Sequence, residues 1–122
     1  MSNAIDNVRQ GRRTYTASGA LSDGMLVVPH STAGQVVASP TTGPVSMVCL
    51  TNAANAEDVE VIQIVRGSEY RFLASNTVTA GSEVEIDSAG NIGKIKNYSA
   101  GTKIGRAQES GAAGGLVRVI AY

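Results

Sequence analysis

Few side chains in this sequence could carry out chemistry. The one histidine, His30, follows Pro29 at the end of an apolar run, and no second histidine can complete a catalytic or metal-binding cluster. The one cysteine, Cys49, lies in the apolar run 45–50, where a small buried side chain is expected rather than a nucleophile. A lone cysteine also excludes an internal disulfide and a cysteine-based zinc site. The sequence therefore predicts no enzyme, no cofactor and no metal.

Three acidic side chains at alternating positions are the strongest remaining candidate for a catalytic group. Glu83, Glu85 and Asp87 share one face of an expected strand, opposite Val84 and Ile86. Paired carboxylates can act as a general acid and a general base. An acidic face exposed to water is the more common meaning of such a pattern. We therefore expect an exposed acidic face above two buried apolar residues.

Two loop motifs are better explained by turns than by ligand binding. The segment 87–91 begins like a calcium-binding loop but lacks the later acidic ligands. The segment 111–115 is rich in glycine but has neither the spacing nor the lysine of a phosphate-binding loop. Both are expected to be hairpin connections.

The elements that would position these residues are short strands. β-prone runs of about 4–8 residues alternate with turn residues about every 8–12 positions, which is typical of a sandwich or barrel. Within 58–65 the apolar residues change phase, from Val59 and Val61 to Ile62 and Ile64, which suggests a β-bulge. The segment 51–57 lacks an apolar stripe at helical spacing and is expected to be a loop or at most one helical turn. The expected strands are 13–17, 25–29, 35–38, 45–50, 58–65, 70–74, 82–87, 91–96, 103–108 and 116–121.

Length and composition narrow the class further. A chain of 122 residues suits one domain with a core of its own. Ten basic residues balance ten acidic ones, which argues against nucleic acid as the partner, because phosphate binding needs a basic excess. No apolar run is long enough to span a membrane, and no secretory signal is recognisable. We predict an all-β chain made in a cytoplasm, with residues 14–122 forming a single β domain, either a small β-barrel or a β-sandwich.

Charge is unevenly placed although it sums to zero. Residues 25–56 contain no aspartate, glutamate, lysine or arginine, residues 57–87 are net acidic and residues 88–122 are net basic. The acidic and basic strands either pair with each other across a sheet or give the molecule two faces that attract partners. The uncharged stretch is either a buried subunit interface, since interface cores are depleted of charge, or a set of central strands with a neutral loop.

The first residues differ from the rest. Residues 1–13 have little apolar content and are expected to form an extended, flexible N-terminal arm. One interpretation is a frayed terminus. The other is a binding arm, whose three arginines meet carboxylates of a partner while the run 14–17 adds to a sheet edge. The candidate binding residues of this arm are Arg9, Arg12, Arg13 and Tyr15.

Four short motifs follow one another in the second half of the chain. They are VTAGSEV at 78–84, DSAGN at 87–91, GTKIGRA at 101–107 and AAGGLVRV at 112–119. This succession resembles the phage capsid decoration proteins, also called cement or head-stabilising proteins. Each motif is only a strand and a turn, so the resemblance lies in their order. The first half matches more loosely, through Gly19, 22–27 and 34–37, and the resemblance spans residues 19–121.

The resemblance implies a structural virion protein on the outer surface of a phage capsid, made in the host cytoplasm. Such a protein binds the major capsid protein and stabilises the expanded head by bridging its subunits, and it has no catalytic residues to carry over. We further expect a homo-oligomer, a trimer with a dimer as the alternative, because linked weak contacts multiply affinity. The partners are then the major capsid protein and other copies of the chain, with no nucleic acid and no membrane.

A second function class is a non-catalytic carbohydrate- or surface-binding β module of a tail fibre or adhesin. Sugar sites commonly use exposed aromatic rings beside polar groups. The sequence has no tryptophan and only five other aromatic residues, scattered over different expected strands. This pattern does not favour a sugar site, but it leaves the class open. The aromatic residues are Tyr15, Tyr70, Phe72, Tyr98 and Tyr122.

Overall fold

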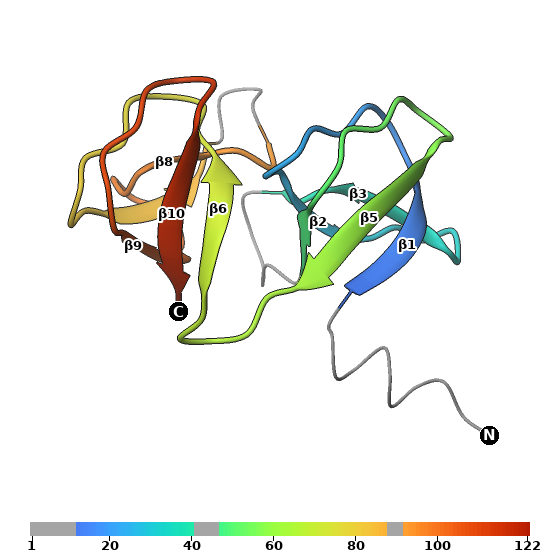
Figure 1. Cartoon of the computed structure of the whole chain (residues 1–122), viewed down its shortest axis with the longest axis horizontal. Helices are drawn as coiled ribbons and strands as arrows, with labels where there is room; N and C mark the ends of the chain where they lie inside the picture. Colours follow the sequence, from blue (N-terminus) through green and yellow to red (C-terminus); the bar gives the residue numbers. More distant parts are fainter. Residues whose placement is uncertain (1–11, 41–46, 88–91) are drawn as a thin grey trace.

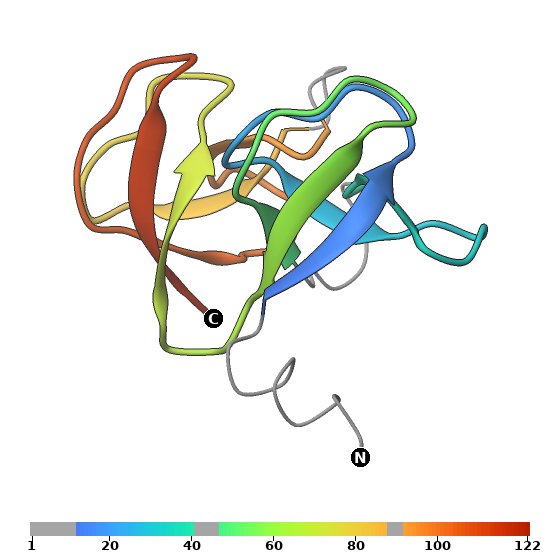
Figure 2. The same cartoon turned by 45° about the vertical axis from the view of Figure 1, so that its right-hand side comes forward.

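The chain folds into two five-stranded units that lie side by side (Figures 1 and 2). A computed structural model describes residues 12–40, 47–87 and 92–122. The first unit is a closed barrel with the strand order β1-β3-β2-β4-β5, and the second is a sheet with the order β6-β10-β9-β7-β8. No helix occurs in the described ranges, so none there is long and apolar enough to cross a membrane. The all-β fold class predicted from the sequence is confirmed.

All ten expected strands are present, with ends shifted by a few residues. The strand β1 begins at Arg12, so the start of the barrel reaches into the segment expected as an arm. The loop expected over 51–57 contains turns and one isolated bridge but no helix, and 111–115 connects two strands, as expected. The strands are β1 (Arg12–Ala17), β2 (Leu26–Pro29), β3 (Gln35–Ala38), β4 (Met47–Cys49), β5 (Asp58–Gln63), β6 (Glu69–Leu73), β7 (Glu83–Ile86), β8 (Ile95–Asn97), β9 (Gly105–Ala107) and β10 (Leu116–Ala121).

The bulge expected in β5 is absent, and the change of phase has another cause. Pairing between β5 and both of its neighbours runs residue for residue without a skipped position. Val59 and Val61 point into the barrel, whereas Ile62 and Ile64 pack against the core of the second unit. The strand carries apolar residues on both faces because both faces are covered.

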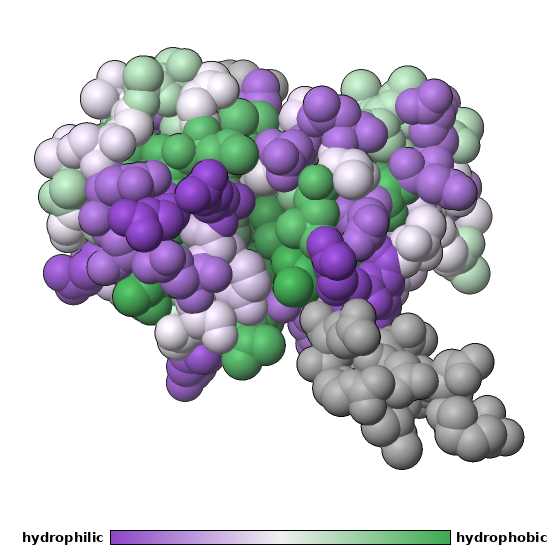
Figure 3. Space-filling model, viewed as in Figure 1, coloured by the Kyte–Doolittle hydropathy of each residue, from purple (hydrophilic) through white to green (hydrophobic). Residues whose placement is uncertain are grey.

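Two hydrophobic cores share one wall, made of β2, β4 and β5. Leu26 and Val27 are neighbours on β2 and both are fully buried, yet Leu26 belongs to the core of the second unit and Val27 to the interior of the barrel. On β4, Val48 likewise faces the second unit, while Met47 and Cys49 face the barrel. A hydrophobic band is visible along this junction between the units (Figure 3).

The shared wall explains much of the uncharged stretch 25–56. Its strands β2 and β4 are buried on both sides by the chain itself, and a charge there would have to leave water without a partner. Of the two interpretations of this stretch, the central strands therefore account for its strand residues. The loop 51–57 is mostly exposed, in keeping with a neutral connection.

The second unit repeats the strand pairing of the first. Leu26 opposite Val48 corresponds to Glu83 opposite Arg106, and a parallel contact of Ala17 with Val36 corresponds to the bridge between Ala74 and Ile95. That single bridge joins the residue after β6 to β8, so the second sheet curves toward closure but, unlike the first unit, is not a closed barrel.

The connecting loops repeat as well. The isolated bridge between Leu21 and Ala53 has its counterpart between Val78 and Gly111, each held by a reciprocal pair of backbone hydrogen bonds. Ala56, at a φ of 70°, corresponds to Gly114, at a φ of 84°. The chain is therefore an internal structural duplication, with the outer wall of the first unit packed on the second.

The shared wall makes a stability prediction. Val48→Ala is expected to lower the free energy of unfolding by about 2–3 kcal/mol, because two buried methyl groups are lost and a cavity is left in the second core. The matched control is Val65→Ala, whose side chain is 58% exposed and which should change stability by no more than about 0.5 kcal/mol. Urea unfolding followed by circular dichroism measures both changes. We propose that residues 14–122 unfold in one transition, and two separate transitions for the two units would contradict this.

Candidate functional site

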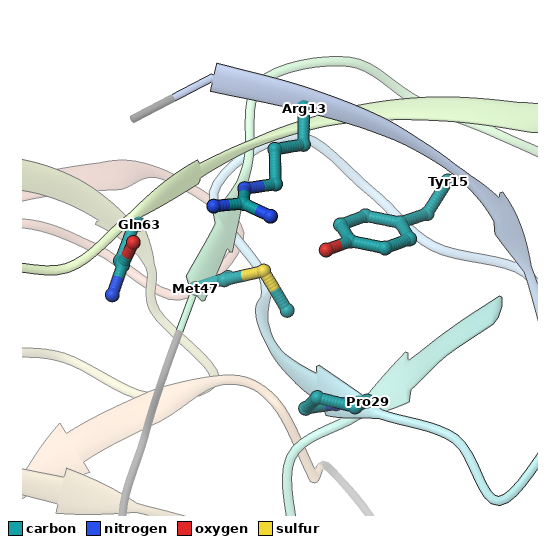
Figure 4. Close-up of a pocket in the computed structure, with 5 residues that line it drawn as sticks. All are labelled: Arg13, Tyr15, Pro29, Met47 and Gln63. Atoms are coloured by element: carbon teal, nitrogen blue, oxygen red, sulfur yellow. The ribbon is translucent and has the colours of Figure 1, made fainter. Parts of the chain in front are cut away.

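The candidate site is a pocket at one end of the first barrel. It is a cavity of about 230 Å³, lined by residues from four strands (Figure 4). Arg13 and Tyr15 come from β1, and the other lining residues stand at the last position of β2, the first of β4 and the last of β5. In chain order, the lining residues are Arg13, Tyr15, Pro29, Met47 and Gln63.

The strand register places Arg13 and Tyr15 at this end. In the antiparallel pair of β1 and β5, Arg13 lies opposite Val61 and Tyr15 opposite Val59. Residues directly opposite each other share a face, so both side chains turn toward the barrel interior. Ala17, the next residue on the same face, is buried in the barrel core. The interior face of β1 therefore runs from an apolar core to a polar rim.

The Arg13 guanidinium has no acidic partner in the described part of the chain. No carboxylate there lies within 4.0 Å of it, and the side chain sits beside Met47, with the Tyr15 hydroxyl directed toward it (Figure 4). A guanidinium offers five donors in a planar fork, and the Tyr15 hydroxyl and the Gln63 amide add polar groups at the rim. The pocket suits acceptor groups such as carboxylates or backbone carbonyls, and its described lining residues include no nucleophile with a base.

The other expected arm residues do not join this pocket. Arg12 lies on the opposite face of β1 and forms an ion pair with Glu60 at 3.2 Å. Both side chains are well exposed, so this pair is worth at most about 1 kcal/mol. Arg9 lies outside the described residues. Of the four candidate residues, the structure brings together Arg13 and Tyr15.

The edge of β1 is only partly open for strand addition. Thr16 donates its backbone N–H to Gly34, and both Thr16 and Ala17 are paired with β3 on one side, while β5 covers the other side. A partner strand therefore finds no free edge at these two residues. Toward the N-terminal end of β1, from Arg12 to Tyr15, no described strand pairs with the edge that faces β3.

The exposed acidic face expected over Glu83, Glu85 and Asp87 is wrong for two of its three residues, because Glu85 and Asp87 are buried and only Glu83 stays partly exposed. Glu85 is 4% exposed and accepts hydrogen bonds from the Ser99 N–H and hydroxyl, both at 2.8 Å, and from the Gly101 N–H. Asp87 is also 4% exposed and accepts a hydrogen bond from the Ser75 hydroxyl at 2.7 Å. Both carboxylates hold loops in place rather than face a substrate.

The pKa of Glu85 follows from this arrangement. Burial by itself raises the pKa of the carboxyl group, but the hydrogen bonds from the loop 99–101 outweigh it, and the pKa lies below its ordinary value of 4.5. Gly101 permits the close approach, because a Cβ at this position would lie 2.2 Å from Glu85 Oε1. Lys96 Nζ adds a positive charge 3.8 Å from Oε2. This carboxylate is committed to structure.

Cys49 and His30, the remaining candidates for a reactive side chain, both have structural surroundings. Burial, together with the nearby Asp23 charge, raises the pKa of Cys49 to about 12, so its thiol is protonated and inert at neutral pH. His30 accepts a hydrogen bond from the Thr32 N–H through Nδ1, which ties it to its own turn. Within the described ranges, no group of three or more metal-ligating side chains gathers.

Comparison with known proteins gives a likeness in fold. No protein-family model matches the sequence, and no curated protein matches it. Among solved structures, the fold is similar to that described as the head fiber gp8.5 N base in bacteriophage phi29. The two chains superpose with a TM-score of 0.72 and 16% sequence identity, over 91% of this chain and 92% of that chain. At this identity the likeness shows a shared fold over nearly the whole chain.

Glu85→Gln tests the structural role of the buried carboxylate. At neutral pH the free energy of unfolding of the variant should be lower than that of the wild type by about 1.5–3 kcal/mol, which is the usual contribution of hydrogen bonds to a charged group. Because the folded-state pKa is lowered, the carboxylate stabilises the wild type above its ordinary pKa of 4.5, and this contribution is lost as the pH falls through the lowered value. Thermal unfolding midpoints from neutral to acid pH should therefore converge for variant and wild type. Glu69→Gln, at an exposed position, is the control, and midpoints that stay equally far apart at acid pH would exclude this role.

Proposed function

We propose that this chain is a non-catalytic structural protein of a phage virion, attached to the surface of the head. The observation that carries the proposal is the fold shared with a phage head-fibre base over 91% of the chain. The order of motifs that resembles capsid decoration proteins points independently to the same place on a virion. The site residues are consistent with binding, since the pocket at the end of the barrel combines hydrogen-bond donors with apolar atoms.

In finer terms, we propose that the protein binds the major capsid protein on the outer capsid surface and stabilises the expanded head by bridging its subunits. Arg9 and Arg12 are the proposed contacts of the N-terminal segment with capsid carboxylates. Arg12 suits this role because it points away from the barrel interior and its side chain is about half exposed. Several weak contacts in one homo-oligomer, a trimer or a dimer, would supply the affinity that a single exposed arginine cannot.

A carbohydrate-binding module of a tail fibre or adhesin, the alternative class, receives less support. Phe72 is buried in the core, and Tyr70 stacks on it with ring centroids 6.1 Å apart, so neither ring forms an open platform for a sugar. Tyr122 and Tyr98 are exposed, but the Tyr122 hydroxyl donates to Glu83 and the Lys103 ammonium lies over the ring of Tyr98. We therefore place head attachment first.

Co-sedimentation with heads tests the proposed function. The purified protein is expected to pellet with expanded heads of the phage or prophage that carries its gene, once their own copies have been removed. Arg12→Glu should weaken binding about tenfold, which corresponds to about 1.4 kcal/mol for a lost charged contact. Arg66→Glu makes the same charge change in an exposed turn and serves as the matched control. A folded protein that stays in the supernatant, together with a signal on a glycan array, would favour the carbohydrate-binding class instead.

A further inference from the structure

Inside the chain, the first unit docks on the second through a defined junction. The Leu73 N–H donates to the Gly24 carbonyl at 2.9 Å, and the Leu26 N–H donates to the Gly93 carbonyl at 2.8 Å. Gly24 is packed so closely that a Cβ there would lie 2.3 Å from Leu116 Cδ2. We call Gly24, Leu26, Val48 and Ile62 the wall surface of the first unit. Leu73, Gly93 and Leu116 form the end surface of the second unit that receives it.

Each of these surfaces has a counterpart in the other unit. The register maps the wall surface of the first unit onto Gly81, Glu83, Arg106 and Ile120 of the second. It maps the end surface of the second unit onto Thr16, Gly34 and Asp58 of the first, next to the pocket of Arg13 and Tyr15.

No other unit of the described chain packs on either counterpart. A Cβ built on Gly81 or on Gly34 meets no atom within 4 Å, in contrast to the close contacts at Gly24 and Gly93. Tyr122, which continues from Ile120 past the end of β10, is 46% exposed, and Arg106 is exposed as well. The duplication therefore leaves two surfaces of the molecule open: the wall surface of the second unit and the end surface of the first unit.

We propose that these two open surfaces bind each other between copies of this chain. The wall surface of the second unit, with Glu83, Arg106 and Tyr122, docks on the end surface of the first unit of the next copy, with Arg13, Tyr15 and Asp58. The contact repeats between molecules the arrangement that already joins the two units within one molecule. The inference deepens the homo-oligomer part of the proposed function and needs no head for its test.

The chemistry of the two open surfaces is matched. Each carries side chains of both charge signs, Glu83 and Arg106 on the wall and Arg13 and Asp58 on the end, so opposite charges can meet in either direction. Tyrosine and arginine are enriched in protein interfaces, and Tyr122, Arg106, Tyr15 and Arg13 supply them here. Compared with the apolar junction inside the chain, both surfaces have become polar together, which suits an assembly whose subunits stay soluble before they associate.

The seam between β1 and β3 in the first unit differs in one respect from the corresponding seam between β6 and β8 in the second. In the first unit, the Thr16 N–H donates to Gly34, whereas in the second the corresponding Leu73 N–H donates to the inserted Gly24. The first unit thus closes its own seam, and the contact between copies rests on side chains. Such a contact joins two different surfaces, so it closes into a ring or continues as a filament. A ring agrees with the trimer or dimer proposed above, and it would place twice as many units as chains around its axis.

Two variants, each blocked on one surface, test this arrangement. Arg13→Glu reverses the charge on the end surface, and Arg106→Glu reverses it on the wall surface. Each should weaken self-association of the isolated protein at least tenfold, measured by light scattering coupled to size-exclusion chromatography. An equimolar mixture of the two variants should form a species of two chains, because one intact wall and one intact end remain per pair. Arg66→Glu, an exposed charge reversal outside both surfaces, should associate like the wild type.

Several results would overturn the inference. A wild type that stays monomeric at its highest soluble concentration excludes the contact outright. Variants that associate normally, or a mixture that gains no association over its components, exclude the head-to-tail pairing and favour one surface meeting its own copy. Circular dichroism confirms that each variant is folded, and Tyr122→Ala provides a second wall variant, since it removes only an exposed terminal side chain. Failure to bind heads, with normal association, would count against the proposed function alone.

Discussion

Burial of one sheet wall on both of its faces is the constraint on which the rest of this structure depends. One face of the strands β2, β4 and β5 lines the interior of the first barrel, and the other face packs into the core of the second unit. Neighbouring residues such as Leu26 and Val27 are therefore both fully buried, although they point in opposite directions. With both faces covered, the same three strands contribute apolar side chains to two cores. A small chain can therefore build two cores without a separate layer of strands for each.

Burial of this wall also determines which positions can carry a charged side chain. Charged residues make up 16% of the sequence and are absent from 25–56, because most strand residues of that stretch belong to the wall. In the second unit, the corresponding strands β7, β9 and β10 have no further unit on their outer face, and Glu83, Arg106 and Arg118 occupy positions there. The salt bridges of Glu83 and Arg118, such as Glu83 with Lys103 at 3.1 Å, lie at the surface and contribute little to stability.

Much of the fold could be predicted from the sequence, since alternation and turn residues mark every strand. What failed was the meaning of two-sided patterns. The phase change at Ile62 predicted a bulge, and Glu85 predicted an exposed face, because a local pattern does not reveal a second layer or a loop that closes over a strand. The duplication was within reach: LSDGMLV at 21–27 and VTAGSEV at 78–84 share their glycine and flanking apolar residues. The pocket was not, because Pro29, Met47 and Gln63 come from three strands and carry no signature.

The duplication also allows the pocket end of the first barrel to be compared with the equivalent end of the second unit. The positions that line the pocket in the first unit are Arg13, Tyr15, Pro29, Met47 and Gln63, and the register maps them onto Tyr70, Phe72, Ile86, Gly105 and Ala121 in the second. The backbone pairing is the same, yet the second set is mostly buried and apolar because the wall of the first unit covers that end. Where no wall covers it, the same end carries a guanidinium, a phenol and an amide. The side chains thus follow what each end faces, and a polar end with an arginine that no described carboxylate neutralises is suited to a polar partner rather than to another apolar wall.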